Sequence, residues 1–209
     1  EKRKKPEDQI SVGLITFSND VVDLVAPTTD LSSATSSASK IKFPDVNYQG
    51  GSDMHAAAAA ATKLIKERRS ASDSPTTYVV VWMTDGVEST RMLIPGGTEV
   101  RDTTVPVTSP YVHANKDSDF MTFATDLCDG IKTEGGLVMV LNTEYVTEGY
   151  YDDTLEQMKS IIFPYMTGRF EKCATSPQYA RRANDPDAII AAARDLTNLA
   201  ISKGGRLTN

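Results

Sequence analysis

Short runs of apolar and β-branched residues alternate along this chain with longer amphipathic stretches. The runs that predict strands are, in chain order, Ile10–Ser18, Val21–Pro27, Tyr78–Met83 and Leu137–Asn142. Turn-forming residues separate the first two runs, so they are expected to pair as a hairpin, with the proline-containing run at an edge. The other two runs are apolar on both faces, which is typical of strands in a parallel sheet that helices cover on both sides.

The stretches between these runs carry helix start signals. Helices are predicted over 31–41, 54–70, 117–135 and 187–203. Asp30 caps the first of these helices, Ser52 or Asp53 caps the second, and Asp185 with Pro186 begins the last. The second helix contains six consecutive alanines, which favour helix and would let it lie close to a sheet.

Apolar strands separated by helices predict a three-layer α/β/α domain with a doubly wound, mainly parallel sheet. A chain of 209 residues is long enough for one sizeable core, so residues 1–209 are expected to form a single domain. Residues 91–116 contain three prolines and show neither the hydrophobic repeat of a helix nor that of a strand. This predicts a long loop or insertion. The region around Pro164 is ambiguous and carries no prediction.

Charge and hydropathy exclude some classes of function. The chain has 28 acidic and 22 basic side chains, a formal net charge of -6, which makes binding to a phosphate backbone a poor expectation. No apolar run reaches the roughly 18 residues that a membrane-spanning helix needs. The basic start of the chain has no apolar segment after it, so it does not resemble a signal peptide.

The residues after the strand Tyr78–Met83 are the first candidate site. Ligands bind to open parallel sheets at the carboxyl ends of the strands, and this strand runs directly into Thr84, Asp85 and Gly86. Asp85 would present its carboxylate at the rim of the sheet, and Gly86 would let the backbone turn sharply. A plain turn or helix cap is the alternative interpretation.

A second polar group stands before the alanine-rich helix. Gly51 follows another glycine and precedes Ser52 and Asp53. The hydroxyl oxygen of Ser52 suits a hard cation, and the glycines would permit a close approach. The alternative is a capped helix that follows a flexible loop.

The order of the segments VGLITFSNDV, APTTDL, GGSDMHAA and VVVWMTDG resembles the von Willebrand factor A domain. In that family a divalent metal is held by a D-x-S-x-S loop, a Thr in a G-G-T-D-like loop and the Asp of a T-D-G loop. Ser52 matches the Thr and Asp85 matches the Asp. The resemblance therefore implies a MIDAS-type site for Mg²⁺, or for Ca²⁺ or Mn²⁺, with these two ligands. It also implies a partner-binding rim formed by Gly51, Asp53, Thr84 and Gly86.

The D-x-S-x-S motif of the family does not occur in these 209 residues. In the family this loop follows a central first strand, whose omission would expose the strand edges and apolar faces of 10–18 and 78–83. We therefore expect that strand and its metal loop upstream of Glu1. With Ser52 and Asp85 alone, a cation would be held weakly, with water completing the six oxygens that Mg²⁺ prefers.

The C-terminal half of the chain narrows the resemblance. The segment DLCDGIKTEGGLVMVLN and the residues from Phe170 onward resemble the end of this domain in TadG-like proteins of tight-adherence (Tad/Flp) pilus systems. This resemblance implies a periplasmic or extracellular-facing domain, anchored in the inner membrane by an upstream helix. Its expected partner is a pilus or envelope protein that offers a carboxylate to the metal.

The chain contains two cysteines, Cys128 and Cys173. An isolated pair fits a disulfide formed in an oxidising compartment, although two buried free thiols are the alternative. Free thiols would favour a second hypothesis, a cytoplasmic regulatory subunit of an ATP-driven, chelatase-like complex. A third hypothesis is a hydrolase that uses Asp85 and a metal-bound water. The chain shows no constellation of nucleophile and base, so we expect a binding module and not an enzyme.

Overall fold

The computed structural model describes residues 10–17, 21–40, 54–71, 76–89, 111–115, 118–122, 127–143, 156, 159–160 and 163–204. The predictions made for Gly51, Ser52 and Asp53 lie outside these residues, as do those for 91–110.

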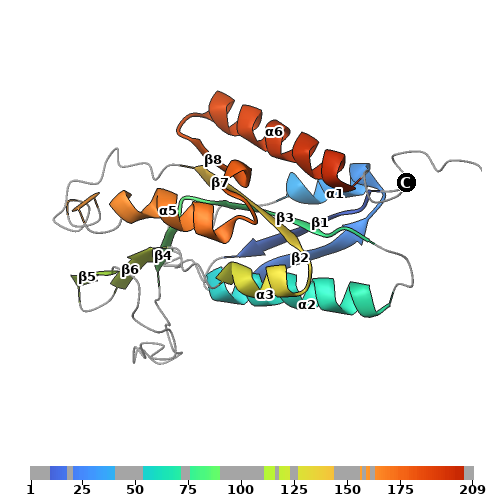
Figure 1. Ribbon diagram of the computed structural model, residues 1–209, viewed down its shortest axis with the longest axis horizontal. Helices are drawn as coiled ribbons and strands as arrows, with labels where there is room; N and C mark the ends of the chain where they lie inside the picture. Colours follow the sequence, from blue (N-terminus) through green and yellow to red (C-terminus); the bar gives the residue numbers. More distant parts are fainter. Residues whose placement is uncertain are drawn as a thin grey trace, which may run out of the picture.

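A three-stranded parallel sheet forms the centre of the fold (Figure 1). It consists of β3 (Val79–Thr84), β7 (Leu137–Thr143) and β8 (Ala180–Ala183), in the order β3-β7-β8. Thr84 and Asn142 are the last paired residues of the two longer strands, so both strands end at the same edge of the sheet. Helices lie on both faces of the strands, which confirms the predicted α/β sandwich with a parallel sheet.

The first two strands form a separate antiparallel sheet. β1 (Val12–Phe17) pairs with β2 (Val21–Thr28), as the hairpin prediction required. Within the described part of the chain, β1 and β3 belong to different sheets, although the rings of Phe17 and Trp82 lie 5.6 Å apart between their centroids.

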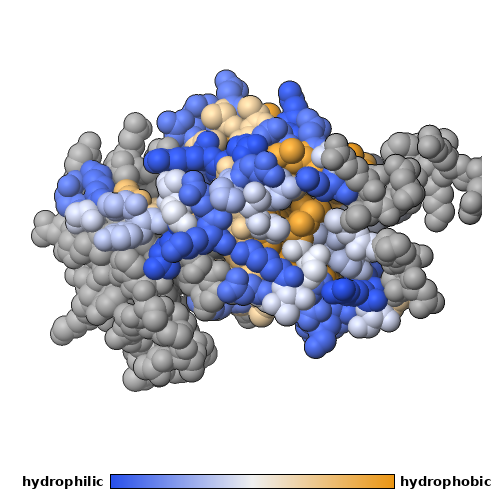
Figure 2. Space-filling view, in the orientation of Figure 1, coloured by the Kyte–Doolittle hydropathy of each residue, from blue (hydrophilic) through white to orange (hydrophobic). Residues whose placement is uncertain are grey.

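The outer face of β3 is poorly covered. Val81 and Met83 are 39% and 50% exposed, whereas Trp82, which points to the other face, is 5% exposed. Figure 2 shows apolar surface in orange below α6, at the level of the strands. Apolar side chains left in water on one face of a strand forgo stabilisation that burial would give.

Four helices cover the sheets. α2 (Met54–Ser70) and α3 (Leu127–Thr133) lie below the strands in Figure 1, and α6 (Pro186–Gly204) lies above them. α1 (Leu31–Ala38) packs against the hairpin. No helix in the part of the chain that the structure describes is long and apolar enough to cross a membrane.

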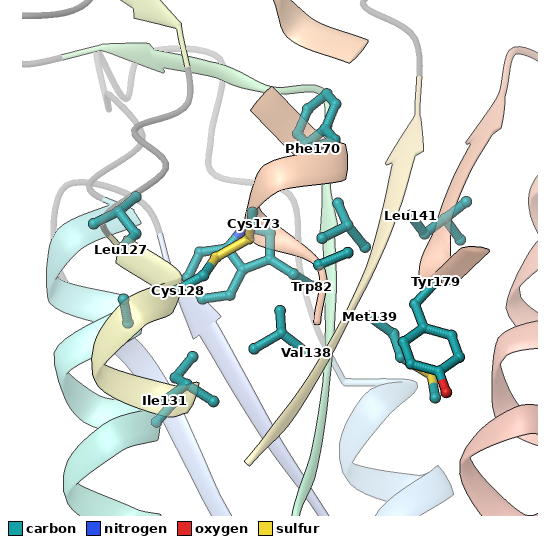
Figure 3. Packing of buried hydrophobic residues seen from close by; sticks show 14 of the residues in the cluster. Trp82, Leu127, Cys128, Ile131, Val138, Met139, Leu141, Phe170, Cys173 and Tyr179 are labelled. Atoms are coloured by element: carbon teal, nitrogen blue, oxygen red, sulfur yellow. A yellow bond between two sulfur atoms is a disulfide. The ribbon is translucent and has the colours of Figure 1, made fainter. Parts of the chain in front are cut away.

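The core gathers around β7 and α2 (Figure 3). The β7 side chains from Val138 to Leu141 are fully buried, because helices cover both faces of this strand. α2 faces the core with small side chains at helical spacing, so it packs closely, as its alanine run predicted. Trp82 is also buried in this core.

Side chains cap two of the helices as predicted. Asp30 Oδ1 accepts hydrogen bonds from the hydroxyl and N–H of Ser32 and from the N–H of Ser33. These bonds, the Ser32 hydroxyl first, lower the pKa of Asp30 below its ordinary value because they favour the ionised carboxylate. At the start of α6, Asp185 Oδ1 accepts from the Ala188 N–H at 2.8 Å.

The prediction of one helix over 117–135 is wrong in its first part. Residues Ser118–Thr122 form strand β6, and the helix α3 begins only at Leu127. β6 pairs with β4 (Val87–Ser89) and β5 (Tyr111–Asn115), so the segment 91–116, expected as a long loop or insertion, contains a strand near its end. Antiparallel pairing with distant segments satisfies the backbone groups that a helix would otherwise satisfy locally.

The elements α5 (Phe163–Cys173) and β8 had no prediction. α5 contains Pro164, which is tolerated in the first turn because its position there has no intrahelical N–H partner. β8 has only four residues, two of them arginines, so no strand-like apolar pattern marks it. Arg181 of β8 forms a hydrogen bond of 2.7 Å from Nε to Asp195 Oδ2 on α6, which joins this strand to its covering helix.

Candidate metal and partner site at the end of strand β3

A tight turn links β3 to β4 and places Asp85 at the carboxyl end of the parallel sheet. Gly86 has a φ of +85°, a conformation that glycine adopts at little cost and L-residues rarely adopt. Thr84 Oγ1 accepts a hydrogen bond of 3.0 Å from the Gly86 N–H, which closes the turn. Asp85 itself is partly buried. The structure thus places Thr84, Asp85 and Gly86 at the rim expected from the sequence.

Asn142 holds the same turn from the neighbouring strand. Its Nδ2 donates to the carbonyl of Thr84 at 3.3 Å and to that of Asp85 at 3.2 Å. Thr84 and Asn142, 8% and 5% exposed, are the two buried polar residues in the described part of the chain. Asn142 was not predicted as part of the site, although a single amide at the end of an apolar strand was the signal that could have found it.

Helix α5 packs directly on the turn. A Cβ placed on Gly86 would lie 2.5 Å from Met166 Cε and still closer to Phe170 Cζ, distances that real Cβ atoms do not show. A larger side chain at Gly86 would therefore require Met166 and Phe170 to shift. This contact could not be predicted, because α5 itself was not predicted.

The beginning of α2 reaches the same edge of the sheet. Thr84 Oγ1 and Met54 Sδ, which belongs to the first residue of α2, are 4.0 Å apart. Ser52 stands two positions before Met54 in the sequence. Two residues span at most about 7 Å of extended chain, so the predicted ligand is tied to an element that touches the Asp85 turn. Whether the Ser52 hydroxyl meets the Asp85 carboxylate stays a prediction.

The two cysteines are joined in a disulfide. Cys128 of α3 and Cys173, the last residue of α5, are both fully buried, and their Cα atoms are 5.2 Å apart. Figure 3 shows this bond in the core cluster that also contains Trp82. The bond fixes α5, which covers Gly86, to α3.

A groove of about 500 Å³ opens between α2 and α3, away from this turn. Its lining consists of His55, Ala58, Ala59, Thr62, Lys63, Lys66, Leu127 and Gly130. Neither Thr84 nor Asp85 lines it, so the groove is a different feature from the rim site.

Comparison with known proteins agrees with this architecture. Residues 2–88 match the sequence model of the von Willebrand factor type A domain. This match covers less than half of the 209 residues, so the first part of the chain is similar to such a domain. A comparison with curated proteins finds no significant match.

Two solved structures share the fold of this chain. Both are crystal structures of the pilus adhesin SpaC from Lactobacillus rhamnosus GG, one of them in an open conformation. Each has a TM-score of 0.57 and covers 93% of this chain, at 17% and 16% sequence identity. This chain spans only 25% of the adhesin chain, so the likeness concerns the fold.

The donor set of the domain is incomplete in the described residues. Among them, no group of three or more His, Cys, Asp or Glu side chains is close enough to hold a metal ion. Asp85 supplies one carboxylate at the place where the von Willebrand factor A resemblance puts a ligand. The described rim therefore offers one carboxylate, and Ser52, the second ligand predicted from the sequence, lies outside the described ranges.

Proposed function

We propose that this von Willebrand factor A domain is a non-enzymatic, protein-binding module of a TadG-like protein in Tad/Flp pilus assembly. The observation that carries the proposal is the Asp85 turn, held at the carboxyl end of β3 by Thr84 and Asn142 and touched by the start of α2. The fold that the chain shares with a pilus adhesin also supports a protein-binding role in a pilus system.

Asp85 and Ser52 would hold a divalent cation at this rim. Carboxylate and hydroxyl oxygens suit Mg²⁺ best, with Ca²⁺ and Mn²⁺ as alternatives. When bound, the ion would offer an open coordination position to a carboxylate of the protein partner. Because only these two side chains are proposed as ligands, water completes the coordination shell and the affinity for the free ion is low.

The disulfide supports a location on the periplasmic or extracellular face. Disulfides persist in oxidising compartments and are rare in the reducing cytosol. The competing hypothesis, a cytoplasmic regulatory subunit of an ATP-driven complex, requires Cys128 and Cys173 to be reduced. Gel mobility of the natural protein with and without reductant separates the two, because only the disulfide-bonded form changes its mobility on reduction.

Titration with Mn²⁺, followed by the relaxation of water protons, tests the metal site. We expect weak, saturable binding by the wild type and loss of binding in Asp85→Ala. The matched control is Asp187→Ala, which removes an exposed carboxylate in the first turn of α6 and should leave binding unchanged. Equal Mn²⁺ affinity in the wild type and Asp85→Ala would refute the role of Asp85.

A further inference from the structure

Asn142 occupies a position where a polar side chain is costly unless it is hydrogen-bonded. It is nearly fully buried and follows four fully buried apolar residues of β7. A buried amide without partners costs about 1–3 kcal/mol, so its partners are expected to be specific. Its Nδ2 donates to two consecutive carbonyls, those of Thr84 and Asp85.

The geometry shows what these bonds do for the turn. The pairing of β3 and β7 ends at Thr84 and Asn142, and the chain leaves the sheet at Asp85. Beyond that point β7 offers no further paired residue to the turn. The Asn142 side chain therefore extends the hydrogen bonding of the sheet by one residue, to the carbonyl of Asp85.

We propose that Asn142 is a positioning residue for Asp85, which sets the direction of its carboxylate by fixing the peptide units on both sides of its Cα. The expected effect of this positioning on ion binding by Asp85 rests on the proposed function. The positioning itself is a property of the turn and can be measured without any ion.

The test compares Asn142→Asp with the wild type. This variant has nearly the same shape but loses both N–H donors, and its ionised carboxylate faces two carbonyl oxygens. Burial raises the pKa of such a carboxyl group, and its protonated form regains one O–H donor. We expect the hydrogen exchange of the Gly86 amide at neutral pH to accelerate at least about tenfold, and the effect to diminish as the pH falls. A buried carboxyl group gives some pH dependence at any core position, so the loss of the donors is judged together with the uncharged variant described next.

Two further variants keep the test decisive. Asn198→Asp makes the same chemical change at an exposed position of α6 and should leave the exchange of Gly86 as in the wild type. Asn142→Thr retains one O–H donor, should give an intermediate effect, and replaces Asn142→Asp if that variant does not fold. Trp82 fluorescence reports whether each variant is folded.

The outcomes separate this inference from the proposed function. Faster exchange at Gly86 together with an approximately tenfold loss of Mn²⁺ affinity supports both. Faster exchange in a protein whose wild type binds no Mn²⁺ supports the positioning role and refutes the proposed metal site. Wild-type exchange at Gly86 in folded Asn142→Asp or Asn142→Thr overturns the inference, whatever the protein binds.

Discussion

Replacing Gly86 by alanine should destabilise the protein severely, and two independent effects set the size of the loss. The φ of +85° suits glycine, and a side chain there costs about 1–2 kcal/mol. The added Cβ would also overlap Met166 and Phe170, and overpacking of a closely packed site costs typically about 1–3 kcal/mol. We therefore expect Gly86→Ala to lower the free energy of unfolding by about 2–5 kcal/mol.

Urea unfolding followed by the fluorescence of Trp82 measures this loss, because the single tryptophan is buried in the core and becomes exposed on unfolding. Gly168→Ala is the matched control. Gly168 lies in α5 beside the same contact residues, but a Cβ there would meet nothing within 4 Å. Alanine in place of an unconstrained helical glycine should stabilise the protein by about 0.5–1 kcal/mol.

A double variant identifies the source of the loss. Phe170→Leu shortens the side chain that the new Cβ would meet, so the cost of Gly86→Ala should be smaller in that background than in the wild type. An unfolding free energy of Gly86→Ala within about 0.5 kcal/mol of the wild type would refute the described packing of α5 on the turn.

Three other predictions concern the rest of the fold. Replacing Cys128 and Cys173 together by serine should lower the unfolding free energy by about 4 kcal/mol in the chain-entropy model for a 45-residue separation, as urea unfolding would show; no change would contradict it. The lowered pKa of Asp30 means that its ionised form stabilises the fold above the ordinary pKa of aspartate, and this contribution is lost as the pH falls through the depressed folded-state value. Asp30→Asn keeps a capping oxygen, so acid titration of stability should become flatter, and an unchanged profile would argue against the cap. Met139→Ala should cost about 2–5 kcal/mol and the half-exposed Met83→Ala clearly less in the same assay; equal losses would show that the outer face of β3 is covered.

The central elements could be predicted because their signals are local. The apolar runs of β3 and β7, the hairpin of β1 and β2, and the caps of α1 and α6 all depend on residues within a few positions of one another. The parallel sheet followed from strands that are apolar on both faces and separated by helices. These features required no knowledge of distant contacts.

The antiparallel sheet of β4, β5 and β6 could not be predicted for the opposite reason. The segment Ser118–Thr122 has a pattern that a helix could also adopt, and its strand conformation depends on partners at 87–89 and 111–115. Likewise, nothing near the short strand β8 in the sequence marks it, and its place follows from pairing with β7. Tertiary pairing overrides local preference in such segments.

The candidate site also contains residues with local sequence signals and residues whose roles depend on distant contacts. Asp85 was found because it follows an apolar strand, and the glycine after it indicated a turn. Asn142 and Phe170 were not found, because they lie 57 and 85 positions after Asp85 in the chain. Their roles depend on strand register and on helix packing, neither of which the sequence pattern specifies.

The residues that contact the turn at Asp85 are themselves held in position by other interactions. Asn142 cannot turn away without leaving a buried amide unsatisfied. Phe170 is held over Gly86 by a helix whose last residue, Cys173, is bonded to α3. The backbone at Asp85 is therefore ordered before any ligand arrives, and binding there loses little conformational entropy. Under the proposed function, a rim with few ligands would still discriminate between partners, because the backbone that carries the Asp85 carboxylate is held in place.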